Sequence, residues 1–145
     1  MNYADIKQYD VANGLGIRVS LFVSGCTHHC KNCFNKETWD FRFGNPFTEA
    51  EIEKILEYLK PSYVSGLSLL GGEPFEPENQ QVLVHLLKKI RETYPQKDIW
   101  CYSGYLLDKD MQPGGAVYTE YTKEMLKQID VLIDGEFVEA KKDLT

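Results

Sequence analysis

Apolar residues recur along the chain at two spacings, and each spacing predicts one kind of element. Short runs of β-branched and apolar residues predict buried strands, and apolar residues three or four apart predict the buried faces of helices. The strands are predicted at residues 17–23, 63–70, 97–104 and 130–135, and the helices at residues 47–60, 77–90 and 121–128. Thr48 and Glu51 have the spacing of a capping box, which places the start of the first helix.

Strands and helices alternate in this order, which predicts an α/β fold with a mostly parallel sheet and its helices on the outside. The chain has 145 residues, enough for one ordinary domain and too few for two, so we expect a single domain over residues 1–145. In parallel sheets, ligands gather at the carboxyl ends of the strands. Four segments share that edge: the loop after Val23 and the turns at residues 71–72, 103–104 and 134–135.

Composition and charge narrow the classes of partner. The net charge is −6 and the 16 Lys and Arg residues are scattered, so we expect no nucleic-acid partner and no anionic membrane surface. No apolar run approaches the roughly 20 residues that span a bilayer. The first residues lack the basic cap and apolar run of a secretory signal. We therefore expect a cytoplasmic protein whose partner is another protein or a small molecule.

Three of the four cysteines lie in one short loop. Cys26, Cys30 and Cys33 fall within residues 24–36, here called the cysteine loop, directly after the first predicted strand. In a reducing compartment, clustered cysteines indicate metal binding or redox chemistry more than disulfides. A 4Fe-4S cluster takes one thiolate per iron, so three loop cysteines would hold three corners and leave one iron open to a substrate or cofactor.

Zinc is the alternative occupant of the cysteine loop. Three cysteines and one histidine form a closed structural zinc site, and His28 or His29 would supply the imidazole. A histidine only two positions after Cys26 is poorly placed to complete the tetrahedron. Cys101 lies inside a predicted strand, where a free cysteine commonly packs as a small buried residue. On the zinc interpretation, the chain is a zinc-stabilised binding module without enzymatic activity.

The surroundings of the three cysteines carry a resemblance to a known family. The Cys-x3-Cys-x2-Cys spacing resembles that of the radical S-adenosylmethionine enzymes, and VANGLGIRVSLFVSGCTHHCKNCFNKETWD resembles the signature of the glycyl-radical-enzyme activases. Within that family, the chain is most similar to the branch that activates anaerobic ribonucleoside-triphosphate reductase. The segments LLGGEPFEPEN, KDIWCYSGY and DVLIDGEFVEAKKDL extend the likeness over nearly the whole chain. The signature residues in register are Asn13, Gly14, Gly16, Arg18, Gly25, His28, Asn35, Thr38 and Trp39.

This resemblance implies a partial (βα) barrel and a 4Fe-4S cluster held by Cys26, Cys30 and Cys33, with S-adenosylmethionine chelated at the open iron. The implied reaction passes one electron to S-adenosylmethionine, and the deoxyadenosyl radical that results removes a hydrogen atom from a backbone glycine of a partner enzyme. The implied partners are anaerobic ribonucleoside-triphosphate reductase as the protein substrate and a reduced flavodoxin or a similar electron donor. Activation of another glycyl radical enzyme, such as pyruvate formate-lyase, is the alternative within the family.

The turns at the strand ends supply the expected cofactor contacts. A Gly-Gly pair alone is a common β-to-α turn, but Gly71, Gly72 and Glu73 resemble the family's Gly-Gly-Asp/Glu-Pro motif. The resemblance implies that the glycines let the backbone approach the amino group of S-adenosylmethionine and that Glu73 accepts a hydrogen bond from it. Ser103 and Asp134 are candidate contacts to the ribose or the methionine carboxylate, with turn or helix caps as the alternative. No side chain is assigned a direct catalytic role.

Two further expectations concern residues outside those turns. Arg18 lies within a predicted strand, where a charged side chain normally faces solvent. Trp39, Phe41 and Phe43 follow the cysteine loop, and we expect them to pack over the cluster and exclude water from it.

Overall fold

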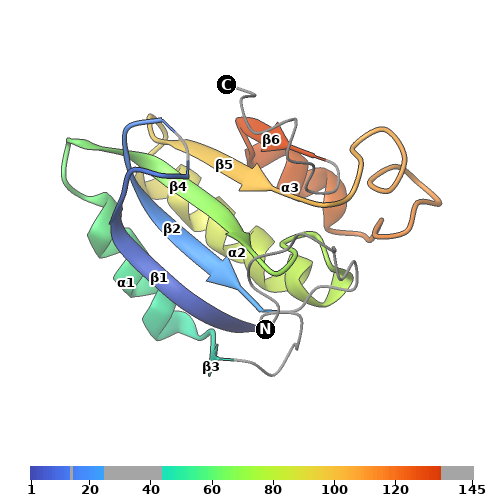
Figure 1. The fold of residues 1–145 in the computed structure, drawn as a ribbon, viewed down its shortest axis with the longest axis horizontal. Helices are drawn as coiled ribbons and strands as arrows, with labels where there is room; N and C mark the ends of the chain where they lie inside the picture. The colour runs from blue at the N-terminus through green and yellow to red at the C-terminus, as the bar shows by residue number, and fades with distance from the viewer. Residues whose placement is uncertain (14, 25–43, 135–145) are drawn as a thin grey trace.

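One six-stranded sheet forms the centre of the structure, a computed structural model that describes residues 1–13, 15–24 and 44–134 (Figure 1). The strands follow the order β3-β1-β2-β4-β5-β6 across the sheet. Their bounds are β1 Asn2–Asp10, β2 Ile17–Val23, β3 Asn45–Pro46, β4 Val64–Gly71, β5 Asp98–Tyr102 and β6 Val131–Ile133. The helices are α1 Glu49–Leu59, α2 Pro77–Thr93 and α3 Thr122–Gln128. The α/β class predicted from the sequence is therefore confirmed.

The sheet is mixed, which corrects the prediction of a mostly parallel sheet. The strands β2, β4, β5 and β6 are parallel, as the alternation of strands and helices predicted. The sequence pattern missed β1 and β3, and β1 pairs antiparallel with both β2 and β3. Only residues 11–16 connect β1 to β2, a connection that suits a hairpin but is too short for the crossover of a parallel pair.

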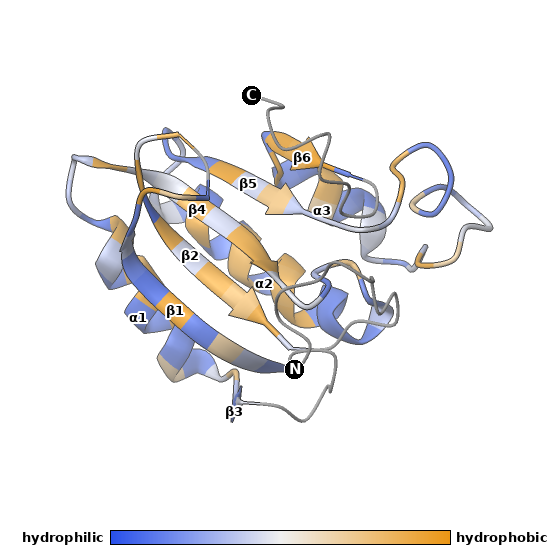
Figure 2. Ribbon diagram, in the orientation of Figure 1, coloured by the Kyte–Doolittle hydropathy of each residue, from blue (hydrophilic) through white to orange (hydrophobic). Residues whose placement is uncertain are grey.

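The three predicted helices are present, and their apolar faces form the core with one face of the sheet. Alternate side chains of the central strands, among them Leu21, Leu69 and Ile99, are fully buried in this core. Figure 2 shows β2 and β4 as largely hydrophobic, whereas β1 is hydrophilic along much of its length. Thr48 and Glu51 form the expected reciprocal capping box at the start of α1. None of the described helices is long and apolar enough to cross a bilayer.

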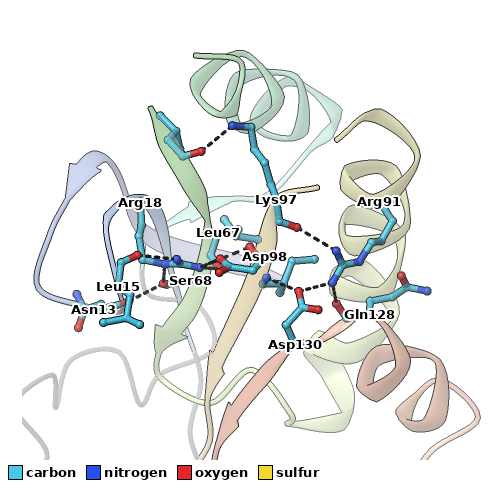
Figure 3. A network of polar contacts seen from close by, with 12 residues as sticks. Asn13, Leu15, Arg18, Leu67, Ser68, Arg91, Lys97, Asp98, Gln128 and Asp130 are labelled. Carbon is cyan, nitrogen blue, oxygen red and sulfur yellow. Dashed lines mark hydrogen bonds and ion pairs between the residues drawn. The ribbon is translucent and has the colours of Figure 1, made fainter. Parts of the chain in front are cut away.

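Arg18 is fully buried in β2, which corrects the expectation that its side chain faces solvent. Its guanidinium group donates to Ser68 Oγ at 2.7 Å and to the carbonyl oxygens of Leu67 and Leu15 at 2.9 and 3.0 Å (Figure 3). It also forms an ion pair with Asp98 at 2.7 Å. These partners compensate for the hydrogen bonds to water that the guanidinium group loses on burial. The network joins the β1–β2 connection to β4 and β5.

Candidate functional site

The cysteine loop begins at the carboxyl end of β2, beside the ends of the other parallel strands. Its ligand candidates Cys26, Cys30 and Cys33 lie outside the described residues, so their roles remain predictions. The same holds for His28, His29, Trp39, Phe41 and Phe43. The described chain does show how the two ends of this segment are held.

Ser24 and Gly44, the residues on either side of the segment 25–43 that carries the three cysteines, both lie against β1. Ser24 is fully buried, and its N–H group donates to the carbonyl oxygen of Asn2 at 3.1 Å. On the other side, Gly44 has a φ of 84°, and a Cβ atom there would collide with the carbonyl oxygen of Tyr3. Glycine alone fits this position without strain. The first residues of β1 therefore fix where the chain enters and leaves the segment that carries the three cysteines.

The Gly-Gly turn packs directly against the end of β2. Gly71 has a φ of 106°, and a Cβ atom there would lie 2.7 Å from both the N and O atoms of Val23. The N–H group of Gly72 donates to the carbonyl oxygen of Val23 at 2.7 Å. The positive φ thus belongs to the first glycine of the pair. The turn therefore contacts Val23, the residue directly before Ser24, where the cysteine loop starts.

Glu73 links the turn after β4 to the turn after β5. Its side chain is 1% exposed, and Oε2 accepts hydrogen bonds from Ser103 Oγ at 2.7 Å and from the N–H of Phe75 at 2.9 Å. Oε1 accepts from the N–H of Gly104 at 2.7 Å. The N–H group of Ser103 in turn donates to the carbonyl oxygen of Ile133 in β6 at 2.9 Å. The structure therefore brings the predicted site residues Glu73 and Ser103 together.

Burial raises the pKa of the Glu73 carboxyl from 4.5 to about 7. The hydrogen bonds from Ser103, Phe75 and Gly104 act in the opposite direction, because they stabilise the ionised form, while the nearby Glu76 raises the pKa further. The desolvation effect is the largest of these. Near neutral pH, the site thus contains a carboxyl group poised between its two protonation states.

The hydrogen bond of Asp134 involves neither Glu73 nor Ser103. It is exposed at the carboxyl end of β6, and its Oδ2 accepts a hydrogen bond from the N–H of Leu107 at 2.9 Å. Asp134 therefore holds the loop that follows β5. The contact of Asp134 with the cofactor stays a prediction.

Sequence reasoning missed one polar residue at this end of the sheet. Asn79 lies in the first turns of α2, is fully buried, and donates from Nδ2 to the carbonyl oxygens of Ser24 at 3.1 Å and Glu73 at 3.0 Å. A signal was present, because Asn79 occupies the same helical face as the buried Leu83 and Ile90. A polar residue on an apolar face needs a hydrogen-bonding partner.

Cys101 is fully buried in β5, as predicted, and burial raises the pKa of its thiol well above the usual value. A thiol held in its neutral form is a poor metal ligand, since metals bind the thiolate. Within residues 1–13, 15–24 and 44–134, no group of three or more His, Cys, Asp or Glu side chains could hold a metal ion. The cysteine loop stays the predicted site of the cluster.

Comparison with known proteins matches both the cluster and the branch that the cysteine signature indicated. The family model of a 4Fe-4S single cluster domain matches residues 12–145.

Three relatives are each named anaerobic ribonucleoside-triphosphate reductase-activating protein. The relative from Pasteurella multocida is 41% identical over 145 residues, which cover 99% of this chain and 88% of the relative. The relative from Escherichia coli is 39% identical over 145 residues, which cover 99% and 89%. The relative from Enterobacteria phage T4 is 39% identical over 137 residues, which cover 94% and 81%. The chain therefore belongs to the family of anaerobic ribonucleoside-triphosphate reductase-activating proteins, with a 4Fe-4S single cluster domain.

Proposed function

We propose that the chain activates an anaerobic ribonucleoside-triphosphate reductase by generating a glycyl radical on it, through reductive cleavage of S-adenosylmethionine at a 4Fe-4S cluster. The observation that carries this proposal is the contact between the Gly-Gly-Glu turn and the end of β2 directly before the cysteine loop, where Gly72 donates to Val23 at 2.7 Å. The names of the relatives support the partner, and the family's 4Fe-4S domain supports the cluster. The proposed class is a radical S-adenosylmethionine oxidoreductase.

The cysteine loop is proposed to hold the cluster through Cys26, Cys30 and Cys33, which leaves one iron for S-adenosylmethionine. When bound, the cluster and S-adenosylmethionine supply the electron and the deoxyadenosyl radical that removes a hydrogen atom from the partner's glycine. The contribution of the chain itself is to bind these groups, orient them and exclude side reactions.

The Glu73 carboxyl suits the positively charged amino group of S-adenosylmethionine. Among the described donors, only the Gly104 N–H bonds to Oε1, so this oxygen can accept a second hydrogen bond. A cation beside a buried carboxyl favours the ionised form and would lower the pKa that burial has raised. We propose that Glu73 accepts from this amino group, while Gly71 and Gly72 allow the backbone to approach it.

Ser103 and Asp134 are the proposed contacts to the ribose or the methionine carboxylate. Their support is positional, because they follow β5 and β6 at the same edge of the sheet as the Gly-Gly turn. Ser103 has the stronger support of the two, since its hydroxyl already bonds to Glu73 at 2.7 Å.

The partner enzyme is proposed to complete the site. The described strands leave edges at β3 and β6, and we propose a partial barrel whose open side admits the partner's glycine-bearing loop. The reacting glycine must lie close to the radical, and a chain of 145 residues is small to enclose a substrate by itself. A reduced flavodoxin or a similar protein is the proposed electron donor.

Transfer of deuterium tests the proposed reaction. The reconstituted protein is incubated anaerobically with reductant, S-adenosylmethionine and an anaerobic reductase carrying deuterium at the Cα of its radical glycine. We expect a glycyl radical signal on the reductase by electron paramagnetic resonance, and deuterium in the deoxyadenosine. A glycine-to-alanine variant of the reductase should give neither. Deuterium arriving from a small molecule instead would contradict the activase function, and a radical formed only on pyruvate formate-lyase would contradict the proposed partner.

Cysteine variants test the cluster. Cys26→Ala, Cys30→Ala and Cys33→Ala are each expected to lose the intact cluster and all cleavage of S-adenosylmethionine. Cys101→Ala is the control, and it should retain its iron because Cys101 is buried in the core. The anaerobically purified protein should be brown. A colourless protein with stoichiometric zinc, or equal iron loss in the Cys101 variant, would refute the proposed ligand set.

A further inference from the structure

Asn79 joins the two backbone segments that the proposed function requires to act together. We propose that Asn79 is a positioning residue that sets the separation between the start of the cysteine loop and the Gly-Gly-Glu turn, and hence between the cluster and bound S-adenosylmethionine. The proposal rests on the proposed function, since it concerns the same cofactor site. It adds a residue on α2 that neither the cysteine signature nor the glycine turn contains.

The geometry of the Asn79 amide is unambiguous. Nδ2 lies 3.1 Å from the carbonyl oxygen of Ser24 and 3.0 Å from the carbonyl oxygen of Glu73. Both partners can only accept, so the nitrogen of the amide must face them and both of its protons are used. One planar group thus spans Ser24, the first residue of the cysteine loop, and Glu73, the acidic residue of the turn.

Each segment joined by Asn79 is also held on its other side. The N–H of Ser24 donates to Asn2 at 3.1 Å, so β1 and α2 fix Ser24 between them. The Glu73 side chain accepts hydrogen bonds from Ser103 and from the N–H of Gly104, so the turn is attached to the chain after β5 as well as to α2. Asn79 itself is set in the helix, where its N–H donates to the carbonyl of Glu76 at 2.8 Å. Movement of either segment must therefore break a bond to Asn79.

Stability alone does not account for this side chain. The Oδ1 atom of Asn79 is buried and accepts no hydrogen bond within the described residues. A buried acceptor without a donor is destabilising, and this loss offsets part of what the two bonds from Nδ2 contribute to stability. The two bonds from Nδ2 therefore point to a requirement for position at this end of the sheet.

The neighbouring Gln80 provides a matched control. It is also fully buried on α2, and its Nε2 donates to the carbonyl oxygens of Phe75 and Val117, each at 2.7 Å. These bonds join the turn between β4 and α2 to the chain after β5, and neither is made to Ser24 or Glu73. Asn79→Asp and Gln80→Glu each replace a donating amide by a carboxyl of the same shape, and Asn79→Ala and Gln80→Ala repeat the comparison without a buried acid.

The experiment measures cofactor binding and cluster spectra in the four reconstituted variants. All four should keep iron and sulfide contents close to those of the unmodified protein. We expect the Asn79 variants alone to bind S-adenosylmethionine about 10–100-fold more weakly by calorimetric titration, as changes to residues that orient metal ligands commonly do. They alone should also lose the change in the electron paramagnetic resonance spectrum of the reduced cluster that S-adenosylmethionine produces.

The outcomes separate this inference from the proposed function. Equal loss of affinity in the Asn79 and Gln80 variants would reduce Asn79 to a general stability role and overturn the inference. Unchanged affinity and spectra in folded Asn79 variants would overturn it as well, while the proposed function stands. Failure of the unmodified, cluster-loaded protein to bind or cleave S-adenosylmethionine would instead refute the proposed function, and the inference with it.

Discussion

Replacement of Arg18 by methionine is expected to destabilise the protein strongly. The Arg18 side chain is fully buried, and its guanidinium group is the common partner of the Leu15 and Leu67 carbonyls and of Ser68 Oγ. Methionine fills a similar volume but donates no hydrogen bond. The substitution therefore leaves two carbonyl oxygens without their donor.

The size of the effect follows from those contacts. Hydrogen bonds from charged donors are worth about 1.5–3 kcal/mol each, and removal of one partner from a buried ion pair costs about 3–5 kcal/mol. The Oδ1 atom of Asp98 that pairs with Arg18 is buried, but the side chain as a whole is 44% exposed, so the carboxylate keeps part of its hydration and the lower end of that range applies. We expect Arg18→Met to lower the free energy of unfolding by about 3 kcal/mol. Arg18→Lys should recover only part of this, because one ammonium group cannot reproduce the fork of a guanidinium.

Arg91→Met is the control for this experiment. Arg91 also donates to two carbonyl oxygens, those of Lys97 at 2.9 Å and Gln128 at 2.6 Å, and pairs with Asp130 (Figure 3). Its side chain is 24% exposed, so its loss should cost only about 1 kcal/mol. Anaerobic urea unfolding followed by circular dichroism measures both variants. If Arg18→Met loses no more stability than Arg91→Met, the argument from burial is wrong.

Three smaller predictions concern the turn and the first helix. Between pH 4.5 and about 7, folded protein keeps on Glu73 a proton that the unfolded chain releases, so stability should fall with rising pH across this window by up to about 3 kcal/mol. Glu73→Gln should flatten this dependence in urea unfolding at about pH 5 and about pH 8, and an unchanged slope would assign the effect to another group. Gly71→Ala should cost about 1–3 kcal/mol more than Gly114→Ala in thermal unfolding, because both have positive φ but only Gly71 would meet Val23. Equal losses would show that φ alone matters. Thr48→Ala should cost about 1 kcal/mol through loss of the capping box, and no change in thermal stability would mean that water replaces it.

The periodic part of the fold was predictable from the sequence because each of those elements has a local signal. The four parallel strands and three helices appear within a few residues of the predicted ranges. β1 had no such signal, since the segment Asn2–Asp10 is mostly polar and only half-buried. Its place in the sheet depends on pairing with β2 and on the short connection between them. Pairing of this kind is decided by contacts that a local pattern does not contain.

The candidate site was predictable to the extent that parallel strands place their carboxyl ends together. That rule placed Gly71, Glu73 and Ser103 at one edge, and the structure shows the hydrogen bond between the last two. The burial of Arg18 and Asn79 could not be predicted in this way, because each forms a hydrogen bond to a partner about fifty residues away in the sequence. A charged or polar residue in a buried segment indicates that such a partner exists, but only the fold identifies it.

The antiparallel strand that the pattern missed has a role at the site. Its first residues hold both ends of the segment that carries the cysteines, through the bond from Ser24 to Asn2 and the close approach of Gly44 to Tyr3. The ring of Tyr3 also packs edge-on against Phe47, at 5.8 Å between centroids, which ties β1 to the chain just before α1. Without β1, this side of β2 would have no partner strand. The mixed topology therefore attaches both ends of the segment that carries the cysteines to β1, in addition to the bond that Asn79 makes from α2.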